Sequence, residues 1–194
     1  MQQFKSKDYV TILLVITNIA VYIFCTIQGN VLYNMGSLSV VDIIDRHDYY
    51  RILTSLFLHA NPQHIWGNMI FLAALGDMLE KSIGHGRFFA IYMLAGIGGN
   101  LLSMGHELAT GQFCSTIGAS GAVFGLIGAL LLLICKKNGT YGQISFRRMI
   151  FAIVYLFYSG TQSETTNNMA HLGGFITGFA VMAVFYCITR RRYK

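Results

Sequence analysis

The sequence predicts an all-α integral membrane protein, a bundle of six transmembrane helices with both termini in the cytoplasm. Composition is the first reason: of 194 residues, 54% are hydrophobic, 11% are charged and one is a proline, whereas about a quarter of the residues in a soluble domain are charged. The second reason is that the charges gather between long apolar runs. An ionised side chain costs several kcal/mol in hydrocarbon, so this clustering indicates that the runs cross a bilayer.

Six apolar stretches approach the roughly 20 residues that a helix needs to cross a hydrocarbon layer about 30 Å thick. The fifth is the weakest because Arg147 and Arg148 interrupt it, so tilt or local thinning of the bilayer must accommodate it. No linker or repeat divides the chain, and we expect one domain over residues 1–194. The helices are expected at residues 9–28, 63–82, 87–105, 117–135, 145–160 and 169–189.

The distribution of basic residues favours six crossings over five. Only Arg46 and Arg51 lie outside the termini and the second and fourth connections. By the positive-inside rule, both termini and these two connections face the cytoplasm, which requires an even number of crossings. Orientation and anionic lipid head groups account for the net charge of +6, so a lipid bilayer is the expected partner and a nucleic acid is not. The cytoplasmic set is Lys5, Lys7, Lys81, Arg87, Lys136, Lys137, Arg147, Arg148, Arg190, Arg191, Arg192 and Lys194.

The chain before the second helix contains a retained helix and a long outer connection. The first apolar run follows a basic start, as a secretory signal does, but residues 25–28 offer no small-residue cleavage site. The outer connection, residues 29–62, alternates apolar residues with aspartates, which favours a segment lying in the membrane interface. Asn61 and Pro62 are typical of a helix cap followed by proline at the first helical position, so we expect the second helix to begin there.

Glycine is concentrated where helices are expected to touch. The sixth helix has Gly174 and Gly178, and the fourth has a glycine at nearly every turn. Small residues four apart on one stripe let two helix backbones approach closely, and helix packing explains most of these glycines. Packing also brings side chains on the two helices within hydrogen-bond reach. The glycines of the fourth helix are Gly118, Gly121, Gly125 and Gly128.

Polar residues occur near the start of the second, fourth and sixth helices, all of which run from outside to inside in this topology. They are His64 with Asn68, Ser120, and His171. At about 1.5 Å of rise per residue, they lie on the order of 5 to 10 Å below the outer interface. Side chains from three helices can therefore converge at one depth.

Ser120 and His171 form the expected catalytic dyad. Serine is a weak nucleophile and needs a base within hydrogen-bond reach. His171 shares a helical stripe with Gly174 and Gly178, so it faces the neighbouring helix. Gly118 and Gly121 flank the serine and allow close approach of a substrate. None of the eight acidic residues is placed as a third member, because each falls on the inner side or in an outer loop.

Acyl transfer also requires donors aimed at the developing oxyanion. His64 and Asn68 lie four residues apart on one helix face and can both donate, together with the backbone amide of Ser120. A metal at His59 and His64 is not expected, because no nearby carboxylate or thiolate completes a usual ligand set. No cofactor is expected. A Gly-x-Ser-Gly stretch by itself is more often packing than catalysis, but ionisable groups inside a membrane are functional by default.

The chain is similar to the rhomboid family of intramembrane serine proteases, in its bacterial type. The resemblance covers almost the whole chain, and ordered motifs in five segments carry it. They are Tyr50-Arg51, His59 together with His64-Ile65-Trp66-Gly67-Asn68, Gly76 with Glu80 and Gly84, Gly118-Ala119-Ser120-Gly121-Ala122, and Ala170-His171 followed by Gly174 and Gly178.

The resemblance implies an endopeptidase that opens outward and cleaves single-span membrane proteins near the outer interface. It assigns Ser120 as nucleophile, His171 as base, and His64 with Asn68 as oxyanion donors. Substrates are then expected to enter between the second and fifth helices. The family's usual tyrosine four residues after the serine is Phe124 here, so we expect stacking on His171 without a hydroxyl. Tyr50 similarly replaces the usual tryptophan.

Other expectations concern the gate, the remaining polar residues and location. The fifth helix and the outer connection 159–168 are both candidates for the gate. Glu80 lies far from Ser120 and is expected to be structural, while His47, His85 and His106 fall in connections and are expected in solvent. Compact size favours a bacterial plasma membrane.

Two alternatives to a protease stay open. One is a catalytically inactive rhomboid-like protein that binds transmembrane segments. The other is a small transporter in which His64 and His171 line an ion path, a hypothesis that leaves the glycine-flanked serine unexplained.

Overall fold

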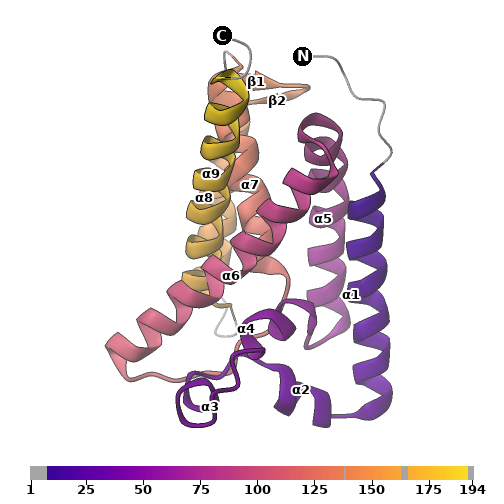
Figure 1. The fold of residues 1–194 in the computed structure, drawn as a ribbon, viewed down its shortest axis with the longest axis vertical. Helices are drawn as coiled ribbons and strands as arrows, with labels where there is room; N and C mark the ends of the chain where they lie inside the picture. The colour runs from indigo at the N-terminus through magenta and orange to yellow at the C-terminus, as the bar shows by residue number, and fades with distance from the viewer. Residues whose placement is uncertain (1–7, 138, 163–165, 192–194) are drawn as a thin grey trace.

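The chain folds into a helical bundle, so the predicted all-α class is confirmed (Figure 1). The computed structural model describes residues 8–137, 139–162 and 166–191. Of the basic residues used above to infer orientation, four lie outside the described residues: Lys5, Lys7, Arg192 and Lys194. One of the eight acidic residues, Glu164, also lies outside them. The long helices are α1 (Tyr9–Gln28), α5 (Pro62–Ile83), α6 (His85–Thr110), α7 (Ser120–Lys136), α8 (Phe146–Thr161) and α9 (Asn168–Arg191).

The long helices occupy the six apolar ranges expected from the sequence. Three of them, α1, α6 and α9 as far as Thr189, are long and apolar enough to cross a membrane, while α7 is apolar but shorter. The α6 helix continues past residue 105 to Thr110, where Gly111 adopts a left-handed conformation and its N–H bonds to Glu107 O. The α7 helix begins at Ser120 and not at residue 117, because Gly118 has φ +129° and its N–H donates to Ser55 O at 2.9 Å.

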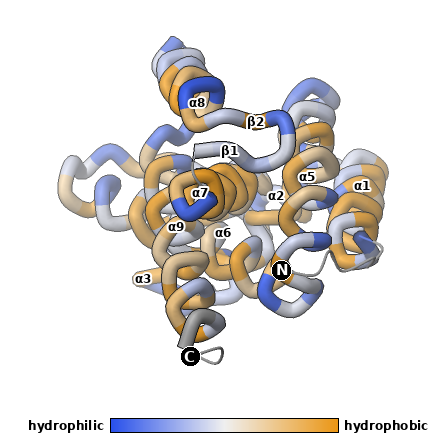
Figure 2. Tube along the Cα trace, turned by 90° about the horizontal axis from the view of Figure 1, so that it is seen from above, coloured by the Kyte–Doolittle hydropathy of each residue, from blue (hydrophilic) through white to orange (hydrophobic). Residues whose placement is uncertain are grey.

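The α7 helix lies at the centre of the bundle, between α8 on one side and α6 and α9 on the other (Figure 2). Every residue of α7 from Gly121 to Ile134 is buried. A side chain added at Gly174 or Gly178 of α9 would overlap the backbone of α7 at Gly121 or Gly125. The expected glycine contact between the fourth and sixth helices is therefore present, and the two backbones touch where the site forms.

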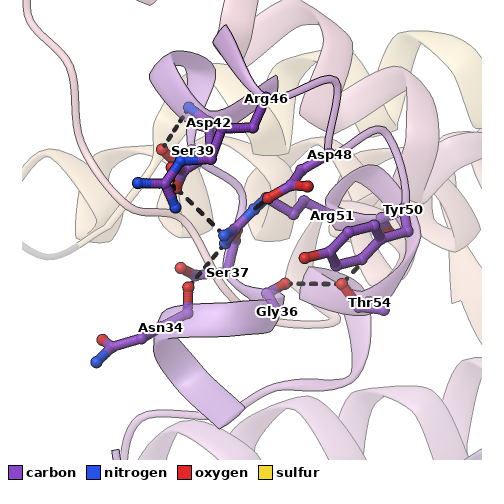
Figure 3. A network of polar contacts seen from close by, with 10 residues as sticks. All are labelled: Asn34, Gly36, Ser37, Ser39, Asp42, Arg46, Asp48, Tyr50, Arg51 and Thr54. Carbon is purple, nitrogen blue, oxygen red and sulfur yellow. Dashed lines mark hydrogen bonds and ion pairs between the residues drawn. The ribbon is translucent and has the colours of Figure 1, made fainter. Parts of the chain in front are cut away.

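The segment of residues 29–61, which was expected on the outer side and is called the outer cap below, is held together by Arg51 (Figure 3). The buried Arg51 guanidinium donates to Asn34 O and Ser37 O at 2.8 and 3.1 Å, and pairs with Asp48 at 3.0 Å and Asp42 at 3.3 Å. Satisfying the cation on all sides offsets the cost of its burial. The segment contains α2 (Val31–Gly36), α3 (Val40–Asp45), α4 (Arg51–Thr54) and the 3-10 turn η1 (Ser55–Phe57).

This cap is attached directly to the residues that precede α7. Leu38 and Thr116 exchange backbone hydrogen bonds at 2.9 and 3.0 Å. Asn100 of α6 donates to Ile52 O and Ser55 Oγ, both at 2.9 Å. The turn around Gly118 is thus fixed from outside the bundle.

The opposite end of the bundle is tied by Glu80, which is fully buried. Its carboxylate accepts from the N–H groups of Val10 and Thr11 at 2.8 and 2.7 Å and from Thr11 Oγ1 at 2.6 Å. It thereby caps the first turn of α1, which confirms the expected structural role. His85 was expected in solvent, and its side chain is 42% exposed. Its Nδ1 nevertheless contacts Glu80, because α6 begins only two residues after α5 ends. A small hairpin of β1 (Thr140–Tyr141) and β2 (Ile144–Ser145) joins α7 to α8.

Candidate active site

The first turn of α7 and the first turn of α9 bring a hydroxyl and an imidazole together. Ser120 Oγ lies 2.9 Å from His171 Nε2, a hydrogen-bond distance. Ser120 is the first residue of α7, and the preceding turn at Gly118 directs the chain so that the serine faces α9. His171 is buried, and the glycine contact one turn further along brings its helix close.

The His171 ring is held by stacking. The Phe124 ring lies parallel to it, with centroids 4.1 Å apart and an interplanar angle of 10°, so the stacking predicted for this position is confirmed. Phe157 of α8 packs edge-on against Phe124 at 5.1 Å. In the described part of the chain, His171 Nδ1 is buried and has no hydrogen-bond partner. No described carboxylate therefore orients the ring from behind.

Beside Ser120, the α5 helix supplies two nitrogen groups around the space that Gly118 leaves open. A Cβ atom on Gly118 would lie 2.7 Å from His64 Nε2 and 3.8 Å from Asn68 Nδ2. Asn68 is buried, and its Nδ2 lacks a partner among the described residues. A buried amide without a partner is costly, so this donor is available to an oxygen placed beside the serine. Asn61 caps α5 by accepting from the His64 N–H at 2.8 Å, as predicted.

His59 also lies in this region. The sequence left two roles open for it, supporting the loop or approaching the site. It is fully buried and its ring meets the His64 ring edge-on, with centroids 5.1 Å apart. Burial, and secondarily the nearby His64, lower the pKa of His59 to about 4. His59 is therefore neutral at neutral pH. Its Nδ1 faces Phe57 O at 3.3 Å, and Tyr33 OH donates to the His59 carbonyl at 2.8 Å.

A polar network at the start of α9 escaped the sequence reasoning. Asn167 Oδ1 accepts from the Ala170 N–H at 3.0 Å, as an N-cap does. Its Nδ2 donates to Ser103 Oγ at 2.6 Å and to Thr116 Oγ1 at 2.8 Å. Ser103 in turn donates to Glu107 Oε1 at 3.0 Å. The only sign of this network in the sequence was an asparagine just before a predicted helix. Glu107 gave no sign, because it was expected in a loop and is instead buried in the extended α6.

The α8 helix packs loosely beside the site. Only Met149 and Gly160 are buried along it, and Phe151 and Tyr155 are exposed. Phe157 contacts Phe124, which stacks on His171, and so connects α8 to the site. The two candidates for the gate are this helix and the connection 159–168 that follows it. Residues 163–165 of the connection lie outside the described residues.

The chain is similar in sequence to several known proteins. A family model described as the rhomboid domain matches residues 46–187. RHOMBOID-like protein 1 of Arabidopsis thaliana is 36% identical over 156 residues, 79% of this chain and 39% of that protein. Rhomboid-like protease 1 of Toxoplasma gondii is 33% identical over 162 residues, 79% of this chain and 52% of that protein.

A bacterial relative gives the same result. Rhomboid protease GluP of Bacillus subtilis (strain 168) is 32% identical over 141 residues, 73% of this chain and 27% of that protein. The chain thus spans about half or less of the length of these three relatives. The family-model match and the apolar helices make it an integral, multi-pass membrane protein. The chain belongs to the rhomboid family.

Proposed function

We propose that the protein is an intramembrane serine endopeptidase that uses a Ser120–His171 dyad. The observation that carries the proposal is the 2.9 Å hydrogen bond between Ser120 Oγ and His171 Nε2. A serine hydroxyl acts as a nucleophile only when a base can take its proton in the transition state. Relatives such as GluP are named rhomboid proteases, which supports the same reaction class.

The reaction proceeds in two halves. In the first, Ser120 Oγ attacks the scissile carbonyl carbon while His171 Nε2 takes the hydroxyl proton. The tetrahedral intermediate collapses, the C–N bond breaks, and His171 returns the proton to the leaving amine. In the second half, His171 Nε2 takes a proton from water while the water oxygen attacks the acyl carbon. The bond between this carbon and Ser120 Oγ then breaks, His171 returns the proton to Oγ, and the new carboxyl terminus leaves.

The carbonyl oxygen that becomes negative is stabilised from α5. Asn68 Nδ2, His64 Nε2 and the Ser120 amide would donate to it in the space left by Gly118. Preorganised donors of this kind contribute more inside a dry site than in water. Stacking on Phe124 keeps the His171 ring in one orientation. In a catalytic triad, the third residue, a carboxylate, has this role.

The proposed topology is six crossings with both termini in the cytoplasm, so that Ser120 opens toward the outside. The substrates are single-span membrane proteins, which enter sideways between α5 and α8 and are cut near the outer interface. The loosely packed α8 is the side from which a helix could enter. In keeping with the relative from Bacillus subtilis, we assign the protein to a bacterial plasma membrane.

A fluorophosphonate probe, which reacts with activated serines, tests the dyad. We expect labelling of the wild type in detergent, none of Ser120→Ala, and labelling of His171→Ala reduced to the background level. Ser115→Ala is the matched control, because this serine is exposed in the segment before α7, and it should label fully. A single-span test substrate should be cut by the wild type and the control only.

The same experiment separates the alternatives. Absence of labelling together with an intact substrate would refute the protease and favour a rhomboid-like protein that binds membrane segments without cutting them. A transporter predicts ion flux that Ser120→Ala leaves unchanged.

A further inference from the structure

A second cavity lies at the end of the bundle away from Ser120. The last turns of α5, α7 and α9 and the first turn of α6 enclose a volume of about 250 Å³. Figure 2 looks onto this end, where α7 finishes in hydrophilic residues beside α9. None of the residues placed in the proposed dyad or oxyanion site lines this cavity.

The walls of the cavity are apolar. Leu133 of α7 and Met182 of α9 are buried side chains that line it, together with Phe185. Met182, Phe185 and Thr189 line it at spacings of three and four residues, which places them on one stripe of α9. From Met182 to Thr189 the helix rises seven times by 1.5 Å, so these side chains span about 10 Å. The cavity therefore has an apolar wall along α9, and it is called the slot below.

Three cations stand around this slot: Arg87, Lys136 and Lys137. Arg87 is half-buried, with its guanidinium carbon 6.0 Å from the Phe185 ring centroid, and Lys136 Nζ lies 5.7 Å from the Tyr186 ring centroid. No carboxylate lines the cavity, and within the described residues none of the three cations forms an ion pair.

The carboxylates nearby are occupied elsewhere. In the last two turns of α5, Asp77 pairs with Lys81, and Glu80 is used by His85 and the start of α1. The slot therefore combines an uncompensated positive charge with a deep apolar wall. A ligand that matches both features has a phosphate joined to a hydrocarbon chain.

We propose that this cavity binds one anionic phospholipid from the leaflet on that side of the membrane. The phosphate lies among Arg87, Lys136 and Lys137, and one acyl chain lies against Leu133, Met182 and Phe185. Free phosphate would leave the apolar wall uncovered, and a zwitterionic lipid would leave the cations without a net counter-charge. Each basic residue near an anionic lipid surface contributes roughly a fivefold gain in binding.

Native mass spectrometry of the delipidated protein, titrated in a neutral detergent, tests the site. We expect one phosphatidylglycerol to bind, with an affinity on the order of 100-fold higher than phosphatidylcholine for three cations. Inorganic phosphate at the same concentration should not displace it. Equal affinity for the two lipids, or displacement by phosphate, would overturn the proposal.

Matched variants locate the binding. Lys136→Gln with Lys137→Gln should lower the affinity for phosphatidylglycerol about 25-fold, at roughly fivefold per cation. Arg147→Gln with Arg148→Gln removes the same charge from exposed residues of the neighbouring α8 that do not line the cavity, and should leave the affinity unchanged. Arg87→Gln alone should cost about fivefold and keeps the test valid if the first variant fails to fold. An equal effect of the control pair would assign the binding to general surface charge and refute the site.

Discussion

At the scale of single residues, Gly118 leaves an open space beside His64 and Asn68, and we propose that the reacting oxygen occupies it. Its φ of +129° is a conformation that favours glycine, and a methyl group there would meet His64 Nε2 at 2.7 Å. The donors His64 and Asn68 can then face the space beside Ser120. Their contribution should appear in the chemical step and not in the fold.

We predict that Asn68→Ala lowers kcat by about 100-fold, because removing one oxyanion donor typically costs 100- to 1,000-fold. The rate of cleavage of a single-span test substrate at saturation measures it. Asn34→Ala is the control, since the Asn34 side chain is exposed in the outer cap, and it should retain full activity. A loss of less than about twofold in Asn68→Ala would remove this residue from the oxyanion site.

His59 makes the stability of the protein depend on pH. Its pKa falls from 6.5 to about 4 on burial, so the unfolded state binds the proton more readily than the folded state. The neutral imidazole contributes fully above pH 6.5, and its contribution is lost as the pH falls toward 4. The shift corresponds to on the order of 3 kcal/mol.

We predict that the wild-type Tm falls between pH 7 and pH 4 and that His59→Gln shows a shallower fall. Thermal unfolding in detergent, measured across this range, checks the prediction. His47→Gln, at an exposed position in the outer cap, serves as the control and should follow the wild type. Identical pH profiles for His59→Gln and the wild type would contradict it.

At the scale of elements, the start of α9 is positioned from α6 and from the segment before α7. Asn167 reaches both Ser103 and Thr116 while capping its own helix. It lies four residues before His171, and Asn167 O accepts from the His171 N–H at 3.2 Å. Its two functions, capping and cross-bridging, can be separated by substitution.

We predict that Asn167→Ala lowers both stability, by about 1 kcal/mol for the lost cap, and kcat, by roughly tenfold or more for a displaced base. Asn167→Ser keeps a capping oxygen but cannot bridge Ser103 and Thr116 as the amide does. It should therefore recover the Tm but not kcat, with KM unchanged. Recovery of both by serine would show that the network acts only on stability.

The contact between α7 and α9 depends on the absence of side chains. We predict that Gly178→Ala lowers the free energy of unfolding by about 1 to 3 kcal/mol, because the added carbon overlaps the Gly125 backbone and cannot be relieved by rotating a side chain. Gly105→Ala on α6 meets nothing within 4 Å and should stabilise its helix by about 0.5 to 1 kcal/mol. Thermal unfolding of the two variants in detergent checks that the first lowers the Tm and the second raises it. Equal shifts in Tm would refute the close contact between α7 and α9.

At the scale of the whole molecule, the number of membrane crossings depends on whether α8 spans the bilayer. Its 16 residues span about 24 Å, less than a hydrocarbon layer of about 30 Å. It can cross only with a thin local bilayer. Of the other long helices, α1, α6 and α9 are long and apolar enough to cross, and α7 has 17 residues. Because α8 is the shortest of the six, the residues that flank it are the ones to test for six crossings against five.

We predict that an impermeant maleimide added to intact cells labels Tyr49→Cys and Gln162→Cys but not Gln143→Cys, in a background free of the native cysteines. All three positions are exposed. Gln143 and Gln162 flank α8, so opposite labelling of the two demonstrates that α8 crosses. Permeabilised cells provide the control, in which all three should react. Protection of both Gln143→Cys and Gln162→Cys in intact cells would mean five crossings.

The sequence by itself predicted the helices, and it supplied the residues that we propose as reacting groups. In lipid every backbone polar group must be satisfied within the segment, so an apolar run becomes a helix wherever it packs. The spacing of His64 and Asn68, and the glycines around Ser120 and His171, are likewise local patterns. They could be recognised without knowing how the helices pack.

Tertiary packing alone decided the distances and the supporting contacts. Ser120 and His171 are 51 residues apart, and Asn167 and Ser103 are 64 apart, so no local pattern reveals that they meet. Tertiary packing also buries His59, in the segment before α5, and Glu107, near the end of α6. The cationic slot exists only because four helix ends come together. Such contacts depend on the packing of whole helices, which local sequence does not encode.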